Sequence, residues 1–172
     1  MTKQIEVEIP KEAKGLRELV RAVDKKDPAP GAVSELRNYF LVNPNVCDAI
    51  GNLSTMTTMS VIMRSFPATS TRTAIDARLD LMRTDLGYES ANALERSLIQ
   101  HVVLCWLRLH DCELRYHMAM GDNPTLAQGG YWEKKLSANQ ARYLRAVETL
   151  ARVRRLNVKI QVNVANQQIV AG

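Results

Sequence analysis

Apolar residues recur every three or four positions along most of this chain, which is the spacing of helices that bury one face. Prolines, glycines and polar clusters, which end helices, separate the runs of this pattern. The spacing predicts helices over residues 11–23, 32–42, 44–63, 71–86, 91–120 and 131–156. We therefore expect a mainly α fold, a multi-helix bundle.

The predicted helix over residues 91–120 is the longest and the most apolar. Its apolar residues form a stripe at helical spacing, made of Leu94, Leu98, Val102, Trp106 and Leu109. Further apolar residues between them widen the stripe to most of the circumference. A helix that is apolar on nearly all sides is buried on several of them, so we expect this helix to be the centre of the bundle.

Two segments near the chain ends follow a two-residue period instead, with apolar and polar residues alternating. This alternation is typical of a β-strand with one covered face. It predicts a short strand at residues 4–9. It also predicts a strand-forming tail at residues 157–172, which follows a helical domain of residues 1–156 and its basic C-terminal helix.

A strand tail needs partners for its backbone hydrogen bonds and cover for its apolar face. Two partners are open: the strand at 4–9 of the same chain, or identical tails of other subunits that close around a symmetry axis. The tail is therefore a candidate element for oligomerisation or for pairing with another protein. The residues that would form its apolar face are Val158, Ile160, Val162, Val164 and Ile169.

Positive charge is concentrated toward the C-terminal end. The chain has 172 residues, in the range of one domain, and a net charge of +5. Residues 131–159 hold eight basic residues against two acidic ones, a net charge of +6, so residues 1–130 sum to −1. A protein that is basic at one end only is expected to contact a polyanion or an acidic partner there.

The basic residues of the last helix are the candidate nucleic-acid contacts. They are Arg142, Arg145, Arg152, Arg154, Arg155, Lys134 and Lys135. Such residues would contact phosphates without reading the sequence, and the binding would depend steeply on salt. Two alternatives stay open: a solvated helix surface, partly stabilised by the helix dipole, and an acidic protein partner.

No group of residues has the spacing that catalysis or metal binding requires. His110, Glu113 and His117 share a helix face, but they match neither HExxH nor the ExxH pairs of carboxylate-bridged bundles. The chain has no GxSxG elbow, Walker A loop or GxGxxG loop. We therefore expect a protein that is not an enzyme and needs no metal or cofactor.

The cysteines and the hydropathy favour a soluble cytoplasmic protein. Cys47, Cys105 and Cys112 are odd in number and have no CxxC spacing, as in reduced cytosolic proteins. The first fifteen residues carry charges where a signal peptide has an apolar stretch. No uncharged run approaches the roughly 18 residues that span a bilayer, so no contact with a membrane is expected.

The basic late helix followed by the tail KIQVNVANQQIVAG resembles the small subunit of phage terminases and related mobile-element proteins. The resemblance implies helical segments that recognise DNA, subunits that assemble into rings, and C-terminal strands that form a barrel touching a larger motor subunit. That family usually has a helix-turn-helix near its N-terminus, whereas a proline-rich gap separates the first two predicted helices here.

These observations predict a non-enzymatic, nucleic-acid-associated assembly protein that resembles a terminase small subunit and oligomerises through its C-terminal helix and tail. Its expected partners are duplex DNA, further copies of itself and one larger protein. The alternative is a helical adaptor or structural protein that docks a protein partner and does not bind nucleic acid.

Overall fold

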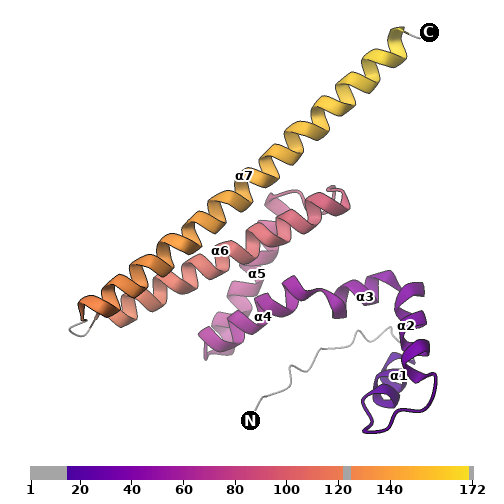
Figure 1. Cartoon of the computed structure of the whole chain (residues 1–172), viewed down its shortest axis with the longest axis horizontal. Helices are drawn as coiled ribbons and strands as arrows, with labels where there is room; N and C mark the ends of the chain where they lie inside the picture. Colours follow the sequence, from indigo (N-terminus) through magenta and orange to yellow (C-terminus); the bar gives the residue numbers. More distant parts are fainter. Residues whose placement is uncertain (1–14, 122–124, 171–172) are drawn as a thin grey trace. The chain divides into compact units, whose positions relative to one another are not determined.

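The computed structural model describes the backbone of residues 15–121 and 125–170, and the side chains of these residues except at 48–49 and 158–170. The described part is entirely α-helical and contains no strand (Figure 1). Its seven helices are α1 (Leu16–Val23), α2 (Ala32–Val42), α3 (Pro44–Gly51), α4 (Leu53–Ser65), α5 (Thr69–Asp85), α6 (Ala93–Met120) and α7 (Leu126–Val170).

The expectation of a mainly helical chain is confirmed, but α7 begins at Leu126, five residues before the predicted start at 131, and one further boundary was missed. The single helix predicted over residues 44–63 is two helices, α3 and α4, separated by Asn52 in an extended conformation. The side-chain oxygen of Asn52 accepts hydrogen bonds from the backbone N–H groups of Ser54 and Thr55, at 3.1 and 3.2 Å. Asparagine is a favoured N-cap because it satisfies these free donors, so it starts a new helix here.

The tail is the main correction. The strand-forming tail predicted for residues 157–172 is wrong over its described part, because α7 continues as one helix of 45 residues to Val170. No glycine or proline lies between Tyr131 and Ala171, so nothing in the sequence stops the helix. Valine and isoleucine lower helix propensity only slightly, whereas a strand without a partner leaves its backbone unpaired. The strand predicted at residues 4–9 lies outside the described residues.

The chain divides into two compact units, residues 1–56 and 57–172, and the division falls within α4. In the first unit, α1 packs on α2, and α2 contacts α3. Leu16 and Ala32, each the first residue of its helix, are buried there. This unit is small, and no cluster of its described side chains suggests a chemistry.

The second unit is built around α6, which lies antiparallel to α7 (Figure 1). The core contains Ile62 of α4, Leu79 of α5, Ile99 and Val103 of α6, and Leu150 of α7. Eight residues of α6 are buried, so the expectation of a central helix is confirmed. Gly87, just after α5, has a φ of 73°, a left-handed conformation that glycine adopts readily.

The two long helices differ in length, which determines what α7 can contact. At 1.5 Å per residue, α6 is about 42 Å long and α7 about 68 Å. The last turns of α7 therefore continue past the first residue of α6 (Figure 1). Asn157 bonds to Glu95, close to that end of α6, and the helix runs on to Val170.

Candidate nucleic-acid interface

Three sides of α7 have different chemistry. The side toward α6 is apolar, and Ala146 and Leu150 on it are buried with 5% and 4% of their surface exposed. Tyr143 also packs against this core. The other two sides face away from α6, and they carry the basic and the exposed apolar residues.

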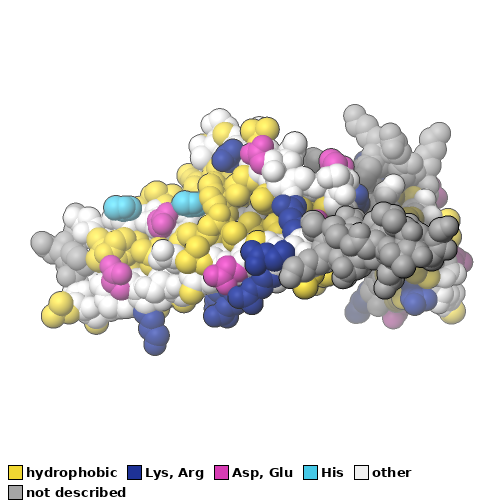
Figure 2. All heavy atoms as spheres, turned by 90° about the horizontal axis from the view of Figure 1, so that it is seen from above, with side chains coloured by type: hydrophobic (Ala, Val, Ile, Leu, Met, Phe, Trp, Pro, Cys, Tyr) yellow, Lys and Arg dark blue, Asp and Glu magenta, His cyan; other side chains and the backbone are white. Residues whose placement is uncertain are grey.

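On the side of α7 where Lys134 also lies, eighteen residues or five turns before Arg152, four basic residues form a line that we call the basic flank: Lys135, Arg142, Arg145 and Arg152. The steps between them are seven, three and seven residues, and such steps return to the same side of a helix. All four side chains are exposed. The space-filling view shows a cluster of lysine and arginine side chains along the lower edge of the face that it draws, beside a band of hydrophobic side chains (Figure 2).

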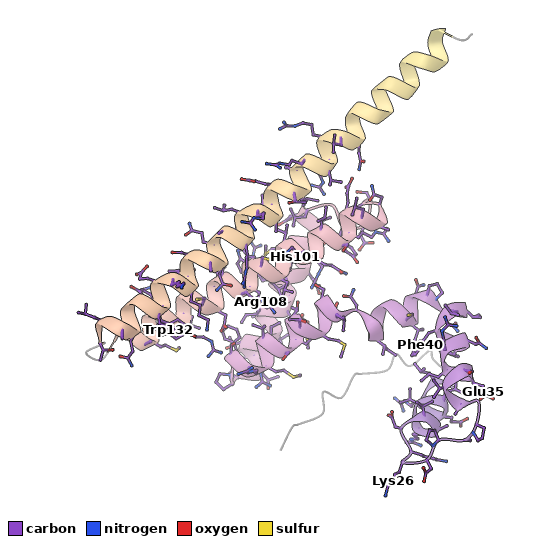
Figure 3. The ribbon with its side chains drawn as sticks, in the orientation of Figure 1. Lys26, Glu35, Phe40, His101, Arg108 and Trp132 are labelled. Atoms are coloured by element: carbon purple, nitrogen blue, oxygen red, sulfur yellow. The ribbon has the colours of Figure 1, made fainter. Side chains whose placement is uncertain are left out.

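The neighbouring helix adds a further cation, Arg108 of α6 (Figure 3). Burial raises the pKa of the Cys105 thiol, and the positive charges of Arg108 and Arg142 partly offset that rise. Both guanidinium groups therefore lie close enough to this thiol to act on its charge. The thiol itself is buried and neutral at physiological pH, so it does not balance their charge.

Of the carboxylates of the two helices, only Glu148 pairs with the basic flank, through an exposed contact of 3.8 Å to Arg152. Each of the five in α6 and α7 has a partner: Glu95 with Arg154 and Asn157, Asp111 with Arg115, Glu113 with His110, Glu133 with Tyr116, and Glu148 with Arg152. By contrast, several cations of these helices have no ion-pair partner among the described residues: Arg108, Lys134, Lys135, Arg142, Arg145 and Arg155. These charges are available to an external anion.

Lys135 is placed differently from the arginines, because two aromatic rings hold it. Its ammonium lies 5.4 Å from the ring centre of Tyr131 and 5.0 Å from that of Trp132. It also donates a hydrogen bond of 3.3 Å to the hydroxyl of Tyr131. Cation–π contacts of this kind keep the charge in place without neutralising it.

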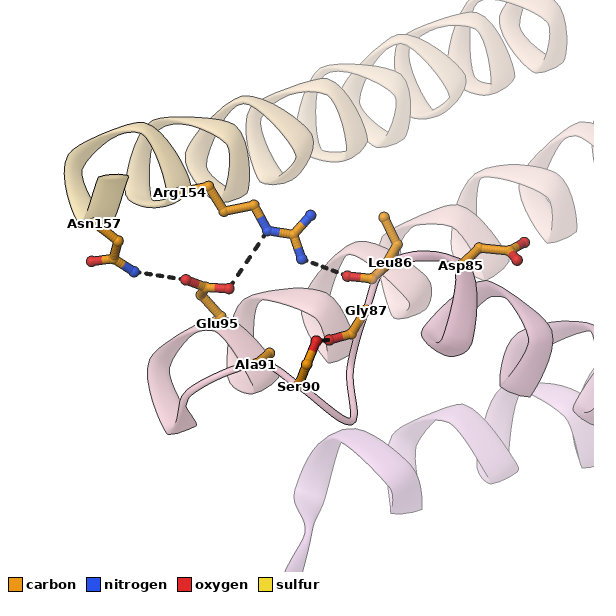
Figure 4. A pocket seen from close by; sticks show the side chains of 8 residues that line it. All are labelled: Asp85, Leu86, Gly87, Ser90, Ala91, Glu95, Arg154 and Asn157. Carbon is orange, nitrogen blue, oxygen red and sulfur yellow. Dashed lines mark hydrogen bonds and ion pairs between the residues drawn. The ribbon is translucent and has the colours of Figure 1, made fainter. Parts of the chain in front are cut away.

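Arg154 has an internal role, which sequence reasoning did not separate from that of the other arginines. Its guanidinium donates a hydrogen bond to the carbonyl of Leu86, after α5, and lies 3.6 Å from the carboxylate of Glu95 (Figure 4). Asn157 donates a second hydrogen bond, of 2.6 Å, to Glu95. We call Glu95, Arg154 and Asn157 the latch, because together they tie α7 to the α5–α6 connection.

The latch lines a shallow, open pocket whose other walls are Asp85, Leu86, Gly87, Ser90 and Ala91 (Figure 4). Its polar groups bond mainly to one another. Ser90 donates to the carbonyl of Gly87 at 3.2 Å, and only 14% of the Glu95 side chain is exposed. The arrangement is that of a structural contact between helices.

The structure does not bring the remaining candidate group into one site: His110, Glu113 and His117. His110 bonds to Glu113 at 2.7 Å and its ring packs against Trp106, whereas His117 packs against Tyr116. Among the described residues, no three His, Cys, Asp or Glu side chains are close enough to hold a metal ion. No described helix is both long and apolar enough to cross a membrane.

Arg108 is the residue that sequence reasoning missed. It lies in an apolar run of α6, where a single arginine carries no signal of its own. Only the pairing of α6 with α7 brings it beside Arg142.

Comparison of the chain with models of protein families, with curated proteins and with solved structures finds no match.

Proposed function

We propose that this protein associates with duplex nucleic acid through the basic flank of α7 and Arg108 of α6, and that it assembles with copies of itself through α7. The observation that carries the proposal is the set of exposed arginines from two helices: Arg108, Arg142 and Arg145 have no ion-pair partner among the described residues, and Arg152 has only the exposed Glu148 at 3.8 Å. In this role the protein performs no reaction. It would position or package nucleic acid within an assembly.

The physical basis is the phosphate backbone. Duplex DNA carries closely spaced negative charges along its axis, and cations that contact them release condensed counterions. From Lys135 to Arg152 the basic flank extends about 26 Å along α7, enough to contact several phosphates. Contacts to phosphates fix the position of a protein on the duplex but do not read its sequence.

The structure removes one part of the terminase-like prediction, the C-terminal strands. The resemblance rested on a basic late helix and a strand-forming tail, and the tail is helical. The proposal therefore keeps DNA association, self-assembly and a larger protein partner, without a barrel of C-terminal strands. Arg154 is also left out of the proposed contacts, because the latch occupies its guanidinium.

The test is the affinity for a fluorescein-labelled duplex of about 30 base pairs, measured by anisotropy at low salt. The double variant Arg142→Glu/Arg145→Glu should lose at least tenfold in affinity. The matched control is Lys25→Glu/Lys26→Glu, which changes the net charge equally but lies between α1 and α2 in the other unit (Figure 3). The control should bind as the wild type does.

Two results would overturn the proposal. One is a wild-type protein that does not bind the duplex at low salt. The other is an equal loss in both double variants, because the total charge and not the basic flank would then govern binding.

The adaptor alternative is supported by a separate observation, the exposed apolar residues Leu144 and Val147 on α7. They could dock a protein partner, although not by strand pairing, since α7 is helical to Val170. The adaptor predicts no binding of the duplex at any salt concentration. The anisotropy measurement therefore separates the two functions.

A further inference from the structure

The side of α7 opposite the basic flank is apolar and uncovered. Leu144 and Val147 have 52% and 39% of their surface exposed, and Ala151 is exposed as well. We call these three residues the apolar flank. Their spacing of three and four residues is the spacing of a helix face that packs on another helix.

The same line continues into the last turns of α7. Steps of four, three, four, three and four residues lead from Ala151 through Arg155, the one charged position on the line, to Val158, Val162, Ala165 and Ile169. From Leu144 to Ile169 the line spans 25 residues, or about 38 Å at 1.5 Å per residue. That is more than three heptads, about the length at which a 3–4 pattern indicates a coiled coil.

The end of α7 also needs a partner on energetic grounds. It continues past the first residue of α6, and no other described helix of the second unit runs beside it (Figure 1). Most of the stability of helices in proteins comes from the packing of an apolar face, and the end of α7 extends without such packing from the described helices of its unit. A partner helix would supply the missing contacts.

Charge favours another copy of the same chain as that partner. Residues 160–172 contain no charged side chain, so two copies can meet along this segment without repulsion. A strongly charged partner would find nothing complementary there. A 3–4 apolar line is also self-complementary, because the same residues on each copy can interdigitate.

We propose that the apolar flank and its continuation to Ile169 form a helix–helix interface with α7 of a second copy. This inference rests on the self-assembly part of the proposed function and names the surface that performs it. The basic flanks of both copies stay exposed, because the two flanks lie on different sides of α7. The assembled form then presents two basic flanks to one nucleic acid.

A helical tail uses a different set of residues for oligomerisation than a strand would. In a strand, Val158, Ile160, Val162 and Val164 would share one face. In a helix, Val158 and Val162 follow the apolar line, whereas positions 160 and 164 fall on a different side. The helix therefore divides the predicted oligomerisation residues into two sets that can be tested separately.

The experiment measures the native mass of the full chain by sedimentation velocity over micromolar concentrations. The wild type should be a dimer or larger. The variants Leu144→Gln/Val147→Gln and Val158→Asn/Val162→Asn should shift toward monomer. The matched control Ile160→Asn/Val164→Asn should keep the wild-type mass, and circular dichroism should show that all variants remain helical.

A monomeric wild type, or equal effects of the two tail variants, would overturn the inference. Retention of the wild-type mass in Leu144→Gln/Val147→Gln would do so too. The two proposals fail separately, because the basic-flank variant Arg142→Glu/Arg145→Glu should assemble normally. A monomeric Leu144→Gln/Val147→Gln should still bind a short duplex, with lower avidity on long DNA.

Discussion

The latch and the basic flank show two uses of arginine on one helix. Arg154 lies two residues after Arg152 and nine after Arg145, and in sequence all three belong to one basic cluster. In the fold, Arg154 bonds to Leu86 and Glu95, and 39% of its side chain is exposed. Arg152 faces away from α6, is 79% exposed, and has only the exposed Glu148 at 3.8 Å.

The difference comes from position on the helix and not from residue type. Arg154 falls on the edge of α7 that faces the α5–α6 connection, where a carbonyl and a carboxylate need a donor. Among the carboxylates of α6 and α7, only Glu148 pairs with the basic flank. We therefore expect the latch to govern stability and the basic flank to govern binding, with little exchange of roles.

The largest expected effect is the salt dependence of duplex binding. With about five phosphate contacts, the affinity should fall by a factor of about 10²–10³ between 50 and 200 mM salt, because each contact releases counterions. Arg142→Ala/Arg145→Ala should lower the slope of log affinity against log salt by about 2. Arg154→Ala should leave the slope unchanged. Equal slopes for the two variants would erase the distinction between latch and flank.

The next effect concerns stability. Glu95→Ala removes the carboxylate shared by Arg154 and Asn157, which also accepts a hydrogen bond from the side-chain amide of Asn92 at the start of α6; the backbone N–H of residue 95 keeps its bond to Asn92. Because Arg154 is partly exposed and keeps its bond to Leu86, we expect a loss of only about 1–2 kcal/mol. Urea denaturation measures it.

The control for the latch is Glu148→Ala, which breaks an exposed pair at 3.8 Å. It should change the free energy of unfolding by less than about 0.5 kcal/mol.

Duplex affinity should be unchanged in Glu95→Ala. A large loss of affinity in that variant would mean that the latch contributes to binding, against the division of roles between latch and flank.

The helices were predictable from the sequence because the 3.6-residue period is a local property, and residues 91–120 show it clearly. The tail was not, because alternation and helical spacing coexist there. Val158 and Val162 fit both periods, and a strand's need for a partner decides between them. A one-dimensional pattern cannot supply that partner.

The candidate site was predictable only in part. The basic residues of α7 stand out by charge alone. Whether each is paired depends on residues far away in the chain, as Arg154 depends on Leu86 and Glu95. Arg108 depends on the pairing of α6 with α7, and its single positive charge in an apolar run gives no advance signal.

The smallest expected effect tests whether Arg108 and Arg142 really share one side. Their charges lower the pKa of the Cys105 thiol, although burial keeps it above the ordinary value. Arg142→Gln should therefore raise this pKa further, whereas Arg145→Gln should change it less. The readout is the pH dependence of Cys105 alkylation, resolved by peptide mass spectrometry.

The raised pKa of Cys105 also determines how this thiol changes the stability of the fold with pH. A pKa that is higher in the folded state favours the neutral thiol there, so its contribution to stability is full at neutral pH and is lost as the pH rises through the raised pKa.

A duplex bound on the basic flank would neutralise Arg108 and Arg142 and shift Cys105 alkylation to higher pH. If bound duplex leaves the alkylation profile unchanged while Arg142→Gln shifts it, the phosphates do not lie beside these two arginines, and the interface must be moved along α7.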